Sequence, residues 1–183
     1  MRILITGPQG SGKTTQAELL SDKLRIAFSS AGDLARKRAE ADDVIGRSVK
    51  EDLEAGRLID DEVMAKILRD ELEKPEYRTG FILDGYPREI AQLKAYDPKF
   101  DIVFYLDISD ELAEKRLLQR GREDDTPEVI EQRLSIFHQL TEPVLDFYQK
   151  QNKLIRIDGS KSIEEVGDEI ARSFTGKVVY GAV

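Results

Sequence analysis

The sequence predicts an α/β fold in which helices cover both faces of a doubly wound parallel sheet. Short apolar runs alternate with longer segments of helical periodicity, and this alternation implies parallel strands joined by crossover helices. The run Ile102–Leu106 is apolar at every position, as expected for a strand that is covered on both faces. With 183 residues, the chain has the length of a single domain.

Five apolar runs predict a sheet of five strands, and five longer segments predict its helices. The strands are expected at Arg2–Thr6, Ile26–Ser29, Phe81–Asp84, Ile102–Asp107 and Leu154–Asp158. The helices are expected at Thr15–Leu24, Glu62–Leu72, Ser109–Gln119, Pro127–Gln151 and Ile163–Ser173. Ser109 is a typical helix N-cap, and Pro127 follows Thr126 as a favoured first helical residue.

Two segments interrupt the alternation of strands and helices. Residues 32–60 are helical in pattern and rich in charge, and they are too long for a simple crossover. Residues 121–126 form a polar break between two helices. Ligands of open α/β sheets bind outside the carboxyl ends of the strands, so both segments are expected as additions at that edge. The tail 175–183 follows the last predicted helix and has no predicted place.

Composition excludes several classes of function. The chain has no cysteine, which excludes disulfides, thiolate metal sites and cysteine nucleophiles, and its single histidine excludes multi-histidine metal sites. The net charge of −8 disfavours nucleic acid as a partner, because that binding depends on Lys and Arg at phosphates. No apolar run is long enough for a signal sequence or a membrane span. A cytoplasmic monomer with no membrane partner is therefore the default expectation.

The segment Gly7–Thr14 matches the phosphate-loop pattern G-x-x-x-x-G-K-[ST]. It follows an apolar strand and opens a helix, which is the context that this motif requires. Glycines let successive N–H groups turn towards a phosphate, and the helix N-terminus adds a positive dipole. The motif predicts a P-loop NTPase fold, with Lys13 at the β- and γ-phosphates and a Thr14 or Thr15 hydroxyl serving Mg²⁺.

Asp84 ends the third predicted strand, as the acid of a Walker B strand does. A carboxylate there can hold Mg²⁺ directly or through its water shell. A GTPase would also need Asn-Lys-x-Asp to bind guanine, but Ile155 stands where that Asp is required after Asn152 and Lys153. The phosphate loop alone leaves ATPases and small-molecule kinases open.

Further motifs favour one family. They are Asp84–Arg88 (Asp-Gly-Tyr-Pro-Arg) with Gln92, Ser30–Leu34 with Arg36, Arg116, Arg120–Asp125, and Arg133 with Leu134. On these residues the chain resembles the nucleoside monophosphate kinases, and most closely the short-lid adenylate kinases. The resemblance implies reversible Mg²⁺-dependent transfer, ATP + AMP = 2 ADP, without a covalent intermediate. It also implies a core (1–29, 61–119 and 128–174), a helical lobe for the monophosphate (30–60) and a short lid (120–127) without structural zinc.

The resemblance assigns the site residues by position. For ATP they are Gly10, Ser11, Gly12, Lys13, Thr14, Thr15, Arg116, Arg120 and Lys161, the last through its backbone carbonyl. For AMP they are Ala31, Arg36, Arg57, Leu58, Ile59, Gly85, Tyr86, Pro87, Arg88, Gln92, Arg122 and Arg133. The catalytic set is Lys13, Arg88, Arg120, Arg122 and Arg133, and Thr14 and Asp84 serve Mg²⁺. The Tyr86–Pro87 peptide is expected to be cis.

Arginine suits this chemistry because its planar fork binds phosphate oxygens bidentately and keeps its charge. Phosphoryl transfer passes through a loose transition state, so catalysis depends on positioning and electrostatic stabilisation. Seven bases are therefore expected to converge on one cleft: Lys13, Arg36, Arg88, Arg116, Arg120, Arg122 and Arg133. Asp124 and Asp125 are expected to fix the lid arginines, and His138 to be an ordinary helix residue.

Three positions depart from the family pattern. Gln9 follows Pro8, which shifts the proline of the loop by one, and Thr14 replaces a glycine. Ala31 stands where adenylate kinases usually carry Thr, as in the UMP/CMP kinases, whereas Gln92 favours adenine. Gln92 and the short lid favour AMP as the acceptor. A UMP/CMP kinase and a catalytically silent nucleotide-binding module are the alternatives.

Overall fold

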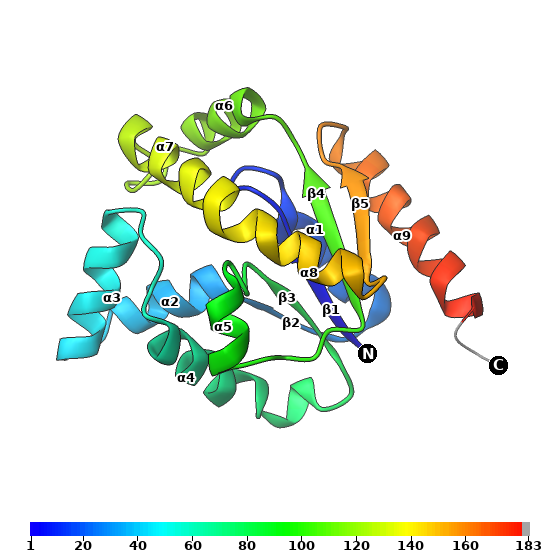
Figure 1. Cartoon of the computed structure of the whole chain (residues 1–183), viewed down its shortest axis with the longest axis horizontal. Helices are drawn as coiled ribbons and strands as arrows, with labels where there is room; N and C mark the ends of the chain where they lie inside the picture. Colours follow the sequence, from blue (N-terminus) through cyan, green and yellow to red (C-terminus); the bar gives the residue numbers. More distant parts are fainter. Residues whose placement is uncertain (181–183) are drawn as a thin grey trace.

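The computed structural model describes the backbone of residues 1–180 and the side chains of residues 1–173. Within this part of the chain, five parallel strands form one sheet in the order β2-β3-β1-β4-β5 (Figure 1). The strands are β1 (Arg2–Thr6), β2 (Ala27–Ser30), β3 (Phe81–Asp84), β4 (Ile102–Asp107) and β5 (Leu154–Asp158). The predicted α/β fold with a five-stranded parallel sheet is confirmed.

Helices fill most of the chain between the strands. They are α1 (Lys13–Leu24), α2 (Ala31–Ala39), α3 (Val44–Glu54), α4 (Asp61–Leu72), α5 (Ile90–Ala95), α6 (Asp110–Arg120), α7 (Pro127–Ile136), α8 (Glu142–Lys150) and α9 (Ile163–Tyr180). A 3₁₀ turn, η1, spans Pro75–Tyr77, and a π turn, η2, spans Phe137–Thr141. In the described part of the chain, no helix combines the length and apolar character that crossing a membrane requires.

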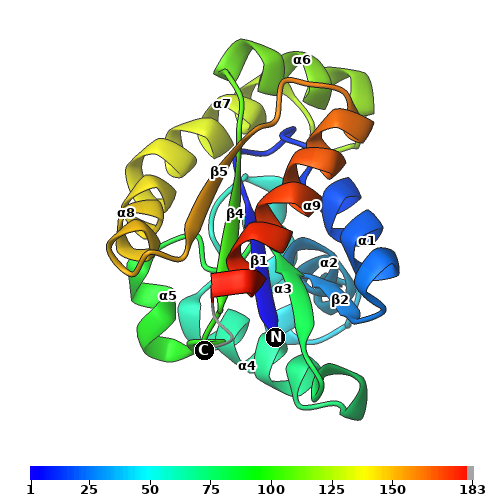
Figure 2. The ribbon, with the colours of Figure 1, turned by 90° about the vertical axis from the view of Figure 1, so that its right-hand side faces the viewer.

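The central strand β1 sends alternate side chains to opposite faces of the sheet. Ile3 and Ile5 pack in the apolar core that α1 and α9 close, whereas Leu4 packs in the core that α4 and α8 close. Figure 2 shows α1 and α9 on one side of the sheet and α8 on the other. Because both faces are covered, the strands are apolar at successive positions, which is the pattern seen in the sequence.

The carboxyl ends of neighbouring strands lie level with one another. Asp84 at the end of β3 is in register with Ile5 of β1 and with Ser30 of β2. The chain leaves β1 into the phosphate loop and leaves β3 into the Asp-Gly-Tyr-Pro-Arg segment. The two motifs found in the sequence therefore emerge side by side from adjacent strands.

Helices α2 and α3 form a lobe that projects from the sheet (Figure 1). The Ser30 hydroxyl accepts the Asp33 N–H at 3.3 Å at the start of α2, and the Asp43 carboxylate accepts the Gly46 N–H at 2.8 Å at the start of α3. A Cβ at Gly46 would lie 2.0 Å from the Ala41 carbonyl oxygen, so the tight turn between the helices requires glycine. The helical character predicted for 32–60 is confirmed.

Helices α1, α4 and α6 differ from their predicted bounds by one or two residues, and the sequence pattern missed α5. Three other elements differ for a clear physical reason. The second strand is Ala27–Ser30, because Arg25 takes a left-handed φ of 54° that ends α1 and leaves Ile26 in the turn. The helix predicted at Pro127–Gln151 is divided by the π turn, just before Pro143. The last helix continues to Tyr180, since no proline stops it. Most of the tail 175–183 is thus helical, and residues 181–183 lie outside the described residues.

The packing of α4 on the sheet predicts a clear effect on stability. Leu68 is fully buried in the core between α4 and the sheet. We expect Leu68→Ala to lower the free energy of unfolding by about 2–5 kcal/mol, since it removes apolar contacts and leaves a cavity. Chemical denaturation measures this change. Leu118→Ala, at a half-exposed position on α6, is the matched control and should change stability by less than about 0.5 kcal/mol.

Candidate functional site

The phosphate loop joins β1 to α1 and packs against α6. Gly10 has a φ of 86°, and a Cβ there would lie 2.7 Å from the Ala113 carbonyl oxygen. No other residue type fits this position without displacing α6. The Ser11 hydroxyl is buried and makes no hydrogen bond within the described part of the chain. The loop therefore combines a fixed backbone with a hydroxyl that donates to none of the described residues.

Lys13 extends from the start of α1 back across the loop. Its Nζ donates a hydrogen bond to the Pro8 carbonyl at 3.2 Å. Burial, joined by the charges of Arg88, Arg120 and Arg122 and opposed by that of Asp84, lowers the pKa of Lys13 to about 8. This concentration of positive charge favours an anion at the loop.

Thr14 and Asp84 meet beneath the loop. The Thr14 hydroxyl donates to one Asp84 oxygen at 2.5 Å, and the other oxygen is buried without a hydrogen bond to any described residue. A hydroxyl and a carboxylate are hard oxygen ligands, and Mg²⁺ usually takes one or two carboxylates together with substrate phosphates. The pair fits that role. Thr15 is exposed, so Thr14 is the threonine beside Asp84.

The segment after β3 folds back on itself around Arg88. Its Tyr86–Pro87 peptide is cis, as expected. The Arg88 side chain donates through Nε to the Gly85 carbonyl at 3.1 Å, and its backbone N–H donates to Oε1 of Gln92 at 2.8 Å. The Tyr86 hydroxyl lies 2.7 Å from the carbonyl oxygens of both Gln92, within α5, and Tyr96, just after it. Arg88 and Gln92 are thereby fixed relative to one another.

A pocket with apolar walls lies between this segment and the lobe. Eight residues predicted for AMP line it, namely Ala31, Arg57, Leu58, Ile59, Gly85, Tyr86, Arg88 and Gln92. Its lining also includes Ala35, Leu53 and Met64, which the sequence analysis missed. Their spacing on helices matches that of core residues, and the sequence gives no signal that distinguishes the two. Pro87 is buried outside this lining.

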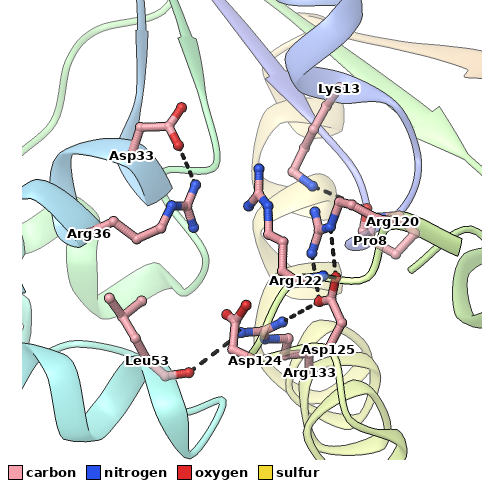
Figure 3. A network of polar contacts seen from close by, with 10 residues as sticks. All are labelled: Pro8, Lys13, Asp33, Arg36, Leu53, Arg120, Arg122, Asp124, Asp125 and Arg133. Atoms are coloured by element: carbon pink, nitrogen blue, oxygen red, sulfur yellow. Dashed lines mark hydrogen bonds and ion pairs between the residues drawn. The ribbon is translucent and has the colours of Figure 1, made fainter. Parts of the chain in front are cut away.

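A polar cleft connects this pocket with the phosphate loop. Seven cationic side chains and two carboxylates of the described residues line it: Lys13, Arg36, Arg57, Arg88, Arg120, Arg122 and Arg133, with Asp84 and Asp124. Figure 3 shows Lys13, Arg120 and Arg122 side by side, with Arg36 facing them from the lobe. Six of the seven bases predicted to converge do so.

Arg116 is the predicted base that does not line the cleft. Its guanidinium donates to the Gly159 carbonyl at 2.9 Å, to Gly10 at 3.5 Å and to Ser160 at 3.4 Å. It thus ties the phosphate loop to the turn after β5. Lys161, which was also predicted to bind ATP, is exposed in the turn after β5, and its Nζ pairs with Glu169 at 2.7 Å. His138, predicted as an ordinary helix residue, is exposed in the π turn and also lies outside the cleft.

Two lid carboxylates hold the arginines in place (Figure 3). Asp125 is buried and accepts two bonds from Arg120, at 2.8 and 2.7 Å, and one from Arg133 at 3.1 Å. Asp124 also pairs with Arg133, whose guanidinium donates to the Leu53 carbonyl of the lobe at 3.4 Å. The expected role in fixing the lid arginines is confirmed for Asp125, which binds Arg120, whereas Asp124 pairs with Arg133 on α7, outside the predicted lid.

The comparisons with known proteins agree with this geometry. A family model described as adenylate kinase matches residues 5–153, which include Lys13, Arg88 and the lid. The chain belongs to the adenylate kinase family. Among the family, an adenylate kinase of Stenotrophomonas maltophilia is 41% identical over 177 residues, covering 91% of this chain and 95% of the relative.

Two other relatives extend the match to nearly the whole chain. An adenylate kinase of Renibacterium salmoninarum is 41% identical over 186 residues, covering 96% of each chain. One of Xanthomonas campestris pv. campestris is 40% identical over 184 residues, covering 94% of this chain and 98% of the relative. Similarity to these adenylate kinases therefore includes β5 and most of α9, which lie beyond the family model.

The buried carboxylate of Asp125 predicts a pH-dependent contribution to stability. Burial alone would raise its pKa, but the bonds and charge of Arg120, the Arg122 N–H and the charge of Arg133 outweigh burial and hold the pKa below 3.8. A lowered pKa stabilises the fold above the unfolded value, and this stabilisation is lost as pH falls through the folded value. We expect Asp125→Asn to cost about 1–3 kcal/mol at pH 7.

Denaturation of both proteins from pH 7 to pH 3 measures this effect. The difference between wild type and Asp125→Asn should be constant above about pH 5 and shrink below pH 4. Asp22→Asn removes an exposed carboxylate outside the cleft and serves as the control. A difference that grows on acidification would contradict the assignment.

Proposed function

We propose that this protein catalyses reversible phosphoryl transfer, ATP + AMP = 2 ADP. One observation carries the proposal: a single cleft joins the phosphate loop at Lys13 to the pocket at Arg88, and cationic side chains line the path between them. Membership of the adenylate kinase family supports the same reaction. Donor and acceptor phosphates would meet in this cleft, where positive charge is concentrated.

In this mechanism the protein positions two polyanions and stabilises the charge between them. The amides of the phosphate loop and Lys13 hold the donor phosphates, and Arg36 and Arg88 hold the acceptor phosphate. Arg120, Arg122 and Arg133 reach the transferring group, whose loose transition state spreads charge over its oxygens. No protein nucleophile is required, because alignment of the reactants and fixed positive charge lower the barrier.

The remaining residues predicted to bind nucleotide keep their assignments as proposals. Thr14 and Asp84 would hold Mg²⁺, which when bound with ATP neutralises phosphate charge. Arg116 and Lys161 lie beside the turn after β5 and would act on the donor side. The lining of the acceptor pocket, from Ala31 to Gln92, would enclose the base and ribose. We also propose that the protein acts as a cytoplasmic monomer.

The acceptor is identified by a direct assay. Mg-ATP is combined in turn with AMP, UMP, CMP and dCMP, and formation of nucleoside diphosphate is followed by chromatography. We expect AMP to be preferred by at least tenfold in kcat/KM, in keeping with the family. Preference for UMP or CMP would show that Ala31 outweighs Gln92. Binding of ATP without transfer to any acceptor would favour the catalytically silent module.

Loss of single charges in the cleft should abolish most of the turnover. We expect Lys13→Ala and Arg88→Ala each to lower kcat/KM for transfer to AMP by about 10²–10³-fold, the effect typical of removing a charge-stabilising group. Lys115→Ala and Arg78→Ala remove exposed charges outside the cleft and are the matched controls. Equal losses in the control variants would contradict the assigned roles.

We propose that the lobe (30–60) and the lid (120–127) close over the core (1–29, 61–119 and 128–174). The Arg133–Leu53 hydrogen bond already links α7 to the lobe, and Gly56 lies close to Val129. Closure would exclude water from the transferring group. We expect amide hydrogen exchange in residues 30–60 and 120–127 to slow when both nucleotides are bound. Unchanged exchange there, alongside slower exchange in the phosphate loop, would rule out closure.

A further inference from the structure

The helical segment from Pro127 to Lys150 contains one widened turn. Helices α7 and α8 run as one continuous rod (Figure 1), but the Glu142 N–H bonds to the Phe137 carbonyl, five residues earlier. Pro143 follows at once. A proline within a helix lacks an N–H and clashes with a carbonyl of the preceding turn, and the π turn accommodates it. Such turns take in one extra residue and often occur at functional positions.

The extra residue changes which side chains share a face of the rod. In a regular helix of 3.6 residues per turn, residues seven apart are offset by only about 20° around the axis, whereas residues eight apart are offset by about 80°. Arg133 and Thr141 are eight residues apart. Because the π turn takes in one extra residue between them, Thr141 lies close to the face of the rod that carries Arg133. Both side chains are buried, and both line a small cavity that also contains Lys13 and Arg88.

Thr141 is bonded to the acceptor segment. Its hydroxyl donates to the Arg88 carbonyl oxygen at 2.7 Å. The backbone N–H of Arg88 donates in turn to Oε1 of Gln92 at 2.8 Å. The backbone of Arg88 is thus held from both sides, by Gln92 within its own segment and by Thr141 from the π turn. Arg88 lies at the polar end of the acceptor pocket, and Gln92 belongs to its lining.

We propose that Thr141 is a positioning residue that sets Arg88 against Arg133 for binding of the acceptor phosphate. Arg133 and Thr141 belong to one helical rod, so the Thr141–Arg88 bond fixes the backbone of Arg88 relative to the rod that carries Arg133. The proposal rests on the function proposed above. The role of Thr141 goes beyond that function, because Thr141 acts through the backbone of Arg88 and need not touch either nucleotide.

The test removes the hydroxyl while keeping the shape of the side chain. We expect Thr141→Val to raise the KM for AMP about tenfold, since the Arg88 carbonyl loses its donor and the segment shifts. The KM for ATP at saturating AMP should stay within about twofold. Thr141→Ser restores the hydroxyl and should recover most of the affinity for AMP. Calorimetric titration with AMP alone provides a second readout that does not need turnover.

Tyr148→Phe is the matched control, since it deletes a buried hydroxyl from the same rod. That hydroxyl has no hydrogen-bond partner among the described residues, so its loss should leave both KM values unchanged. Thr141→Ala also removes the hydroxyl and introduces the strongest helix former. It is assayed in parallel in case the valine variant does not fold. If neither folds, the hydroxyl is structural and the proposal fails.

Other outcomes would also overturn the proposal. Wild-type affinity for AMP in Thr141→Val, equal losses for ATP and AMP, or a serine variant as impaired as valine would each do so. Failure of the wild-type protein to transfer phosphate to AMP would instead overturn the proposed function. The calorimetric comparison would then still decide the role of Thr141, and a wild-type protein that does not bind AMP would end both proposals.

Discussion

Mutual repulsion among the cationic side chains of the cleft is the constraint that its other parts must satisfy. Two unit charges 4 Å apart repel by about 4 kcal/mol at the effective dielectric constant of a protein surface. Seven such side chains share this lining. Asp124 and Asp125 hold Arg120 and Arg133, while the charge of Asp84 and the Pro8 and Gly85 carbonyls act on Lys13 and Arg88. Arg36 and Arg57 pair with Asp33 and Asp52. The cations are thus kept in place while remaining available to phosphates.

The sheet explains why these charges meet in one place. Parallel strands end at a common edge, and the register of β1, β2 and β3 places Ile5, Ser30 and Asp84 level there. The phosphate loop, the acceptor segment and the lobe all begin at this edge. The whole chain has a net charge of −8, whereas the lining of the cleft has more cationic than anionic side chains. A positive cleft in an acidic protein also directs anionic ligands to one site.

Motifs with a fixed spacing made most of the fold and site predictable from the sequence. The phosphate loop, the end of β3 and the lid arginines are local patterns, and each lies where its pattern indicated. Arg116 could not be placed in this way, because its partners at Gly159 and Ser160 are remote in sequence and offer only backbone carbonyls. Met64 and Leu53 line the acceptor pocket but have the spacing of core residues. Long-range packing decides such positions, and a single sequence does not record it.

The bonds of Asp125 also have a consequence for the entropy of binding. Ordering one residue of a flexible loop costs about 1–2 kcal/mol. Asp125 already ties the lid to Arg120, to the Arg122 backbone and to Arg133 before any nucleotide arrives. Part of the conformational entropy of the lid is therefore lost when the chain folds. Substrate binding then has less entropy loss to offset. The carboxylate that restrains the arginines thereby also preorganises the lid.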